Sequence, residues 1–117
     1  MILYPNQHFN NVREITIDFL TKNKINALIL DVDNTLIDYD KNLSEETVKW
    51  AEGLKKEGIK LYILSNSNKK EKVKTVAEKL KIEYEYFGKK PLKTGFKKVQ
   101  KKLEEKPENI FLSNWLY

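Results

Sequence analysis

The sequence predicts an α/β protein in which a mainly parallel sheet is covered by helices on both faces. Short apolar runs, such as residues 25–30 and 59–64, alternate with longer segments whose apolar residues recur at helical spacing. Strands that alternate with helices in this way are typical of βαβ units, whose parallel strands need crossover connections. Because the chain has 117 residues, we expect a single domain over residues 1–117.

The first half of the chain is predicted to run helix, strand, helix, strand. Apolar residues near helical spacing over residues 12–22 indicate a helix, despite several β-branched residues. Residues 25–30 are too few for an ordinary helix and rich in branched apolar side chains, which indicates a strand buried on both faces. Ser44 is a suitable N-cap for the next helix, which Gly58 would end, and residues 59–64 would form the second strand.

The second half continues this alternation. The apolar residues of the next predicted helix fall on one face: Val73, Val76, Ala77 and Leu80. Residues 84–87 indicate a short third strand, and Pro91 suits the first turn of a further helix. The inward face of that helix would consist of Leu92, Phe96, Val99 and Leu103. Residues 109–113 indicate a fourth strand.

Two carboxylates, Asp31 and Asp33, directly follow the first predicted strand. In open α/β sheets ligands bind outside the carboxyl ends of the strands, so a pair of acids there is a candidate site. Asp31 could attack phosphorus and form an aspartyl-phosphate intermediate. Asp33 could protonate the leaving oxygen and later deprotonate the hydrolytic water. Taken alone, the same residues also suit a solvated turn after a strand.

Polar residues occur at two further points that fit the same chemistry. Ser65 follows the second strand as Asp31 follows the first, and its hydroxyl and the Asn66 backbone amide could bind phosphate oxygens. Lys90 precedes the last predicted helix, where its ammonium could hold the phosphoryl group. Individually, residues 65–68 are equally well explained as a polar turn and Lys90 as a surface lysine. The order of these residues therefore supports a phosphoryl-transfer site more than any one of them does.

These residues resemble the first three motifs of the haloacid dehalogenase superfamily of phosphatases. The matching segments are Asp-Val-Asp-Asn-Thr-Leu at 31–36, Ser-Asn at 65–66 and Lys-Pro at 90–91. Their spacing is similar to that of the cap-less IIIA subclass. The segments around residues 3–5, 28–31 and 89–93 resemble the bacterial YqeG type, which is related to phosphatidylglycerophosphate phosphatases. The resemblance implies a Rossmann-like three-layer sandwich without a large cap domain.

The resemblance also implies a role for each matching residue. Asp31 would be the nucleophile and a magnesium ligand, and Asp33 would be the acid/base residue with its backbone carbonyl on the metal. The phosphate site would comprise Thr35, Ser65, Asn66 and Lys90. The implied function is a magnesium-dependent phosphomonoester hydrolase that acts through an aspartyl-phosphate, on phosphatidylglycerophosphate or another phosphorylated metabolite.

The fourth motif departs from the family pattern. The family usually has Gly-Asp after the last strand and another acid a few residues later, whereas here the corresponding residues are Ser113 and Asn114 and the chain stops at Tyr117. Asn114 offers a neutral amide oxygen, so we expect Asp31, Asp33 and Asn114 to bind Mg²⁺ weakly. We therefore expect a domain that is incomplete at its C-terminus. A catalytically impaired or inactive remnant that acts as a binding module is the alternative to an active phosphatase.

Composition and charge narrow the expected partners and location. The formal net charge is +5, but Arg13 is the only arginine and most lysines are interspersed with glutamates, which argues against a nucleic-acid partner. The chain has no cysteine and no apolar run long enough for a signal peptide or a membrane span, so a cytoplasmic location is expected. The expected partner is a phosphorylated small molecule or lipid head group. Peripheral membrane contact and binding to other acidic surfaces stay open, and the oligomeric state is not predicted.

Overall fold

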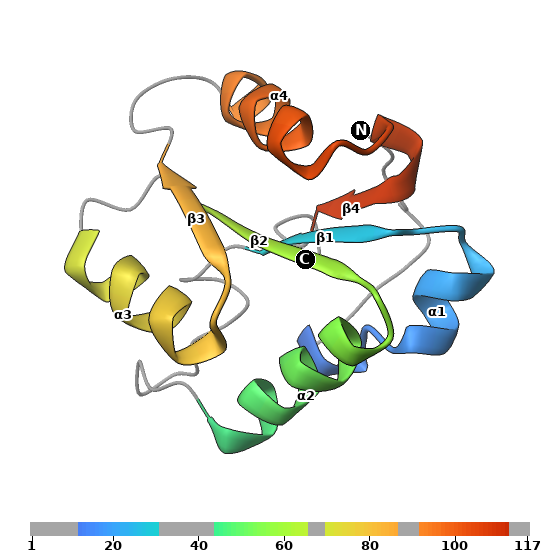
Figure 1. Cartoon of the computed structure of the whole chain (residues 1–117), viewed down its shortest axis with the longest axis horizontal. Helices are drawn as coiled ribbons and strands as arrows, with labels where there is room; N and C mark the ends of the chain where they lie inside the picture. Colours follow the sequence, from blue (N-terminus) through green and yellow to red (C-terminus); the bar gives the residue numbers. More distant parts are fainter. Residues whose placement is uncertain (1–11, 31–43, 66–69, 87–91, 113–117) are drawn as a thin grey trace.

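The computed structural model describes residues 12–30, 44–65, 70–86 and 92–112 (Figure 1). In chain order the elements are η1 (Val12–Glu14), α1 (Ile17–Lys22), β1 (Ala27–Leu30), α2 (Glu45–Lys56), β2 (Lys60–Ser65), α3 (Lys70–Leu80), β3 (Glu83–Tyr86), α4 (Leu92–Leu103), η3 (Pro107–Asn109) and β4 (Ile110–Leu112). The four strands form one parallel sheet in the order β3-β2-β1-β4. The predicted alternation of helices with parallel strands is therefore confirmed.

The strand β1 lies inside the sheet, and all four of its residues are fully buried, as the sequence predicted. Its register places Leu30 level with Ile63 of β2, and Ile29 level with Leu112 of β4. Successive side chains of a strand point to opposite faces, so β1 contributes to two hydrophobic clusters. Leu28 and Leu30 belong to one cluster, and Ala27 and Ile29 belong to the other.

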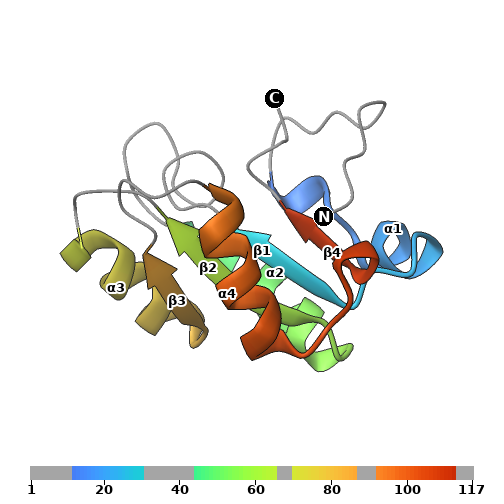
Figure 2. The same ribbon diagram turned by 90° about the horizontal axis from the view of Figure 1, so that it is seen from above.

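Helices cover both faces of the sheet (Figures 1 and 2). The helices α1, α2 and α3 lie on one face, where they contribute Leu20, Leu54, Val73 and Leu80 to the first cluster. Within the described ranges α4 is the only helix on the other face, where its side chains Phe96, Val99 and Leu103 complete the second cluster. The predicted three-layer sandwich is confirmed. No helix in the described part of the chain is long and apolar enough to cross a bilayer.

The predicted helix over residues 12–22 is interrupted, so that prediction is partly wrong. A 3₁₀ turn, η1, comes first, and α1 begins only after Thr16. The Thr16 backbone is extended and its hydroxyl accepts a hydrogen bond from the Phe19 amide at 3.1 Å, which makes it the N-cap of α1. The carbonyl of the preceding residue, Ile15, accepts a 2.8 Å hydrogen bond from Trp50 Nε1 of α2. A cap and a tertiary contact thus outweigh the helical spacing of the apolar residues.

Three helices end in the same backbone turn before a strand. The left-handed residues at these turns are Lys24 (φ 58°), Gly58 (φ 87°) and Lys81 (φ 57°). In each case the isoleucine that follows donates its amide to a carbonyl in the last turn of the helix: Ile25 to Leu20 at 2.8 Å, Ile59 to Leu54 at 3.0 Å, and Ile82 to Ala77 at 3.0 Å. This is the hydrogen-bond pattern of a Schellman motif, which satisfies helix carbonyls and turns the chain toward the sheet.

We expect Gly58 to be required for its left-handed conformation and for nothing else. An added Cβ would meet no atom within 4 Å, so Gly58→Ala introduces only backbone strain. It should lower the free energy of unfolding by about 1 kcal/mol. Gly53→Ala is the matched control, because Gly53 lies in the interior of α2 and also has open space around it. That substitution should raise the free energy of unfolding by about 0.5–1 kcal/mol. Urea unfolding of both variants measures the difference, and two changes of the same sign would contradict this account.

Candidate functional site

The carboxyl ends of the four parallel strands lie at one edge of the sheet, which we call the carboxyl edge. The strands end at Leu30, Ser65, Tyr86 and Leu112. Neighbouring strands are aligned so that Leu30 lies level with Ile63, and Ser65 level with Tyr86. The arrowheads of the four strands point the same way in Figure 2. The last residues of the four strands are thus brought to the same side of the molecule.

The strand order reverses between β1 and β4. The chain moves outward from β1 to β2 and β3, and then returns to place β4 on the other side of β1. In open α/β sheets such a reversal leaves a crevice beyond the strand ends, and ligands bind there. Asp31 is the residue that follows Leu30, the last residue of β1, in the chain. The predicted nucleophile is therefore joined to the strand at which the order reverses.

Ser65 is the one predicted site residue that lies within the described ranges. It is the last residue of β2, one position beyond the predicted end of that strand, and it is 1% exposed. The alternation of side chains puts it on the same face as Leu61 and Ile63, the face that α2 and α3 cover. A hydroxyl group therefore belongs to the carboxyl edge, as expected, while its binding to phosphate stays a prediction.

The other predicted site residues lie outside the described residues: Asp31, Asp33, Thr35, Asn66, Lys90 and Asn114. Their distances from one another and from Ser65 stay predictions. Among the side chains that are described, no group of three or more His, Asp or Glu residues could hold a metal ion. A magnesium site at the carboxyl edge would depend on Asp31, Asp33 and Asn114, whose carboxylate and amide oxygens are suitable Mg²⁺ ligands.

Tyr86 is a polar residue of the carboxyl edge that the sequence did not single out. It ends β3 and is the register partner of Ser65 on β2. Its hydroxyl is buried and has no hydrogen-bond partner among the described residues. Burial raises the pKa of this hydroxyl, and the neighbouring Tyr84 and Glu71 raise it further. A tyrosine at the end of a short strand is too common to be recognised from sequence as part of a site.

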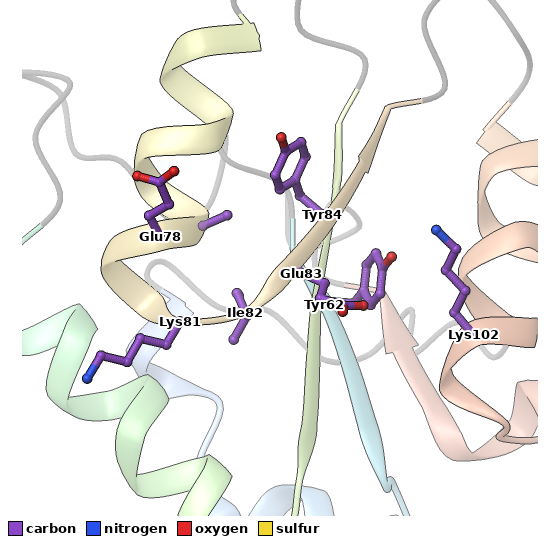
Figure 3. Close-up of a pocket in the computed structure, with 8 residues that line it drawn as sticks. Tyr62, Glu78, Lys81, Ile82, Glu83, Tyr84 and Lys102 are labelled. Atoms are coloured by element: carbon purple, nitrogen blue, oxygen red, sulfur yellow. The ribbon is translucent and has the colours of Figure 1, made fainter.

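The hollow around β3 lies away from the carboxyl edge. It has a volume of about 490 Å³ and is open to solvent. Glu78 and Tyr84 line it on the α3 side of β3, while Tyr62 and Lys102 line it on the α4 side (Figure 3). Tyr62 is level with Glu83, the first residue of β3, so the hollow belongs to the opposite end of this strand. Charges of both signs around an open depression are typical of a hydrated surface.

Ion pairs fix the position of α4 against β3. The Glu85 carboxylate lies 2.8 Å from Lys102 Nζ and 3.4 Å from Lys98 Nζ. The hydrogen bond from Lys102 lowers the pKa of Glu85 more than burial raises it, and the attraction of both lysines lowers it further. The same hydrogen bond raises the pKa of Lys102, with a smaller effect from Tyr62. These contacts link exposed lysines of α4 to the neighbouring strand β3.

A second set of contacts fixes the direction of α4. Lys60, the first residue of β2, donates to the Leu103 carbonyl at 2.6 Å and lies 2.9 Å from Glu105. The hydrogen bond from Lys60 is the main reason why the pKa of Glu105 is lowered, and burial opposes it. The last residues of α4 lie beside the start of β2. The first turn of α4 therefore lies nearer to the carboxyl edge.

Comparisons with known proteins find similarity along most of the chain. The family profile described as haloacid dehalogenase-like hydrolase matches residues 28–89. A protein of Bacillus subtilis (strain 168) named "Probable phosphatase YqeG" is 33% identical over 106 residues, which cover 90% of this chain and 61% of that protein. This chain therefore spans about three-fifths of the length of that relative.

Two solved structures share the fold. One, from Vibrio cholerae, is a proposed 3-deoxy-D-manno-octulosonate 8-phosphate phosphatase with a TM-score of 0.64 and 18% identity, and the match covers 86% of this chain and 58% of that one. The other, from Legionella pneumophila, is a proposed HAD superfamily hydrolase of subfamily III A with a TM-score of 0.63 and 24% identity. Its match covers 80% of this chain and 57% of that one. At these identities the likeness supports the α/β fold.

Acid should weaken the contacts of α4. The pKa values of Glu85 and Glu105 are below the ordinary 4.5 in the folded protein, so both carboxylates stabilise the fold above about pH 4.5. This contribution is lost as the pH falls through the lowered values. We expect Glu85→Gln to cost up to about 1 kcal/mol near neutral pH, because its lysine partners are partly exposed, and to reduce the slope of stability against pH below about pH 5.

The control for this substitution is Glu83→Gln, on the same face of β3. Glu83 is exposed and forms no ion pair with any described residue. Its variant should keep the pH dependence of the parent protein. Urea unfolding at a series of pH values gives the slopes, and an unchanged slope in Glu85→Gln would contradict the assigned role of this carboxylate.

Proposed function

The chain belongs to the haloacid dehalogenase-like hydrolases, and from that membership we propose that it is a magnesium-dependent phosphomonoester hydrolase with its site at the carboxyl edge. One observation supports this most. Ser65 ends β2, and β2 is paired in parallel with β1, which Asp31 follows in the chain. Ser65 thus ends a strand that is adjacent to the one that Asp31 follows in the chain, as the first two phosphatase motifs require.

The first half of the proposed reaction transfers the phosphoryl group to the protein. An oxygen of Asp31 attacks phosphorus, and the bond between phosphorus and the ester oxygen breaks. Asp33 donates its proton to that leaving oxygen, so an alcohol departs and an aspartyl-phosphate is left. Two neighbouring carboxylates repel each other, which favours keeping one of them protonated, as a general acid requires.

The second half releases inorganic phosphate. Asp33, now a carboxylate, takes a proton from water while the water oxygen attacks phosphorus and the bond to Asp31 breaks. The phosphoryl oxygens would be held by Thr35, Ser65, Asn66 and Lys90. Magnesium bound by Asp31, Asp33 and Asn114 would supply positive charge that offsets the charge of the phosphoryl oxygens.

The substrate class that we infer is a phosphomonoester of a small metabolite or of a lipid head group. The Bacillus subtilis relative is named only as a probable phosphatase, and the Vibrio cholerae neighbour is a proposed phosphatase of a sugar acid phosphate. Phosphatidylglycerophosphate is the lipid that the resemblance of residues 3–5, 28–31 and 89–93 suggests.

A second candidate function is phosphate binding without turnover. Asn114 occupies the position at which the family pattern has an aspartate, so the proposed metal ligands carry less negative charge. Magnesium often needs only one or two carboxylates together with water and substrate phosphate, which is why catalysis remains our first proposal. The two functions differ in one measurable respect, the release of alcohol and inorganic phosphate.

We predict that the chain hydrolyses a generic aryl phosphate when Mg²⁺ is present. Asp31→Asn removes the nucleophile and should lower kcat/KM by roughly 10⁴-fold or more. Asp33→Asn removes the proton donor and acceptor and should cost about 10²–10⁴-fold. The colour of the released phenol measures the rate, and intact-protein mass spectrometry detects the phosphorylated protein, which Asp31→Asn should not form.

The matched control is Asp18→Asn, an identical change on the exposed surface of α1. It should leave the rate within about twofold of the parent, as expected for a surface change. Activity that survives in Asp31→Asn would disprove the nucleophile assignment. A parent protein that binds orthophosphate but never releases phenol would support the second candidate function.

A further inference from the structure

The helix α4 carries an unusual charge. Its sequence, Leu-Lys-Thr-Gly-Phe-Lys-Lys-Val-Gln-Lys-Lys-Leu, contains five lysines and no carboxylate. Its formal charge of +5 equals the net charge of the entire chain, so the remainder of the protein is neutral overall. In α2, by contrast, three lysines balance three glutamates. Charge is therefore segregated onto one helix.

These lysines cover the outward side of α4, which we call the lysine face: Lys93, Lys97, Lys98, Lys101 and Lys102. All five are exposed, while the apolar side of the helix is buried against the sheet. Lys98 and Lys102 lean inward to Glu85. Lys93, Lys97 and Lys101 follow one another at a spacing of four residues, which makes them neighbours along the helix.

The row formed by Lys93, Lys97 and Lys101 works against helix stability. Like charges four residues apart repel each other, and none of these three lysines forms an ion pair with another described residue. The other contacts of α4 do not neutralise the row, because Glu85 is already shared by Lys98 and Lys102. Binding of a negatively charged partner outside the row would offset this repulsion.

The location of the lysine face suits a flat partner. Within the described ranges α4 is alone on its side of the sheet, so its outer side projects from that layer (Figures 1 and 2). Lys93 to Lys101 extend over about 12 Å along the helix axis. The row starts in the first turn of α4, toward the carboxyl edge, and ends beside the start of β2.

We propose that the lysine face binds an anionic lipid bilayer, with α4 lying parallel to the membrane surface. Lysines near an anionic leaflet each contribute attraction without needing a shaped pocket. Within residues 93–103 of α4 the exposed residues are only lysines and Thr94, so we expect the contact of this part of the helix to be electrostatic. The lysine face has no arginine and no exposed aromatic ring, the groups that contribute most to nucleic-acid binding.

This orientation has a consequence for the carboxyl edge. Because α4 runs alongside the sheet, a bilayer against its outer side would leave the carboxyl edge facing along the membrane surface. Anionic groups at the level of the lipid head groups would then lie beside this edge. The binding itself does not depend on catalysis, so it holds or fails independently of the proposed hydrolysis.

The test is vesicle binding by the full chain and two triple variants. Vesicles of equal parts phosphatidylglycerol and phosphatidylcholine are compared with pure phosphatidylcholine, in about 0.1 M and about 1 M salt, where the Debye length falls from about 10 to about 3 Å. One variant is Lys93→Gln/Lys97→Gln/Lys101→Gln. The control is Lys49→Gln/Lys56→Gln/Lys79→Gln, which removes three exposed lysines from α2 and α3 on the other face.

The parent and the control should bind the anionic vesicles in low salt, and binding should disappear in high salt and on pure phosphatidylcholine. The α4 variant should partition on the order of a hundredfold more weakly, from roughly fivefold for each lysine. Glutamine has nearly the helix propensity of lysine, and circular dichroism checks folding. Lys97→Gln alone, expected to bind about fivefold more weakly, replaces the triple variant if that variant unfolds.

If the two triple variants lose vesicle binding to the same extent, the proposal is overturned, because the net charge of the protein alone would then explain the binding. Failure of the parent to bind anionic vesicles would overturn it as well. If the parent protein does not bind vesicles but binds a DNA duplex or poly-glutamate through the lysine face, its partner is another polyanion. The membrane assignment is then wrong.

Discussion

Burial of β1 on both faces is the constraint on which the rest of the structure depends. Its four apolar residues are completely removed from water, and burial of each large one stabilises the fold by about 1.5–3 kcal/mol. A strand buried in this way needs a parallel partner on each side and a helical layer on each face, which β2, β4 and the helices provide. Parallel pairing then gathers the strand ends at one edge, which is why we propose that Asp31, the residue after Leu30 in the chain, belongs to a site there.

Much of this arrangement can be predicted from sequence, because it follows from local patterns. The apolar run before Asp31 predicts a doubly buried strand, and Gly58 predicts the end of α2. The interruption of the predicted helix over residues 12–22 near Thr16 is harder to predict from the sequence. The apolar spacing there suits one continuous helix, and the outcome depends on a side-chain cap and on the contact of Trp50 with Ile15. Tertiary contacts of this kind have no signature in a single sequence.

The arrangement of the candidate site, too, could be predicted only in part from the sequence. The position of Ser65 at a strand end follows from the length of an apolar run, whereas its register with Tyr86 depends on how β2 and β3 pair.

The distribution of charge on the molecule could also be predicted only in part from the sequence. Over the whole chain lysines and glutamates appear mixed, yet the helix boundaries assign five lysines and no acid to α4. We therefore propose two separate regions for anions, the carboxyl edge for a phosphoryl group and the lysine face for an extended surface. The lysine face is linked to the sheet by the ion pairs of Lys98 and Lys102 with Glu85 of β3.

The central claim is that phosphate and magnesium bind at the carboxyl edge. Amide chemical shifts in a ¹H–¹⁵N spectrum test it most directly, when orthophosphate is added with Mg²⁺ to the full chain. The account predicts shifts at the strand ends, Leu30 and Ser65, and none at the strand starts, Ala27 and Lys60, which serve as internal controls. Shifts confined to the hollow around Glu83, with Leu30 and Ser65 unchanged, would contradict it.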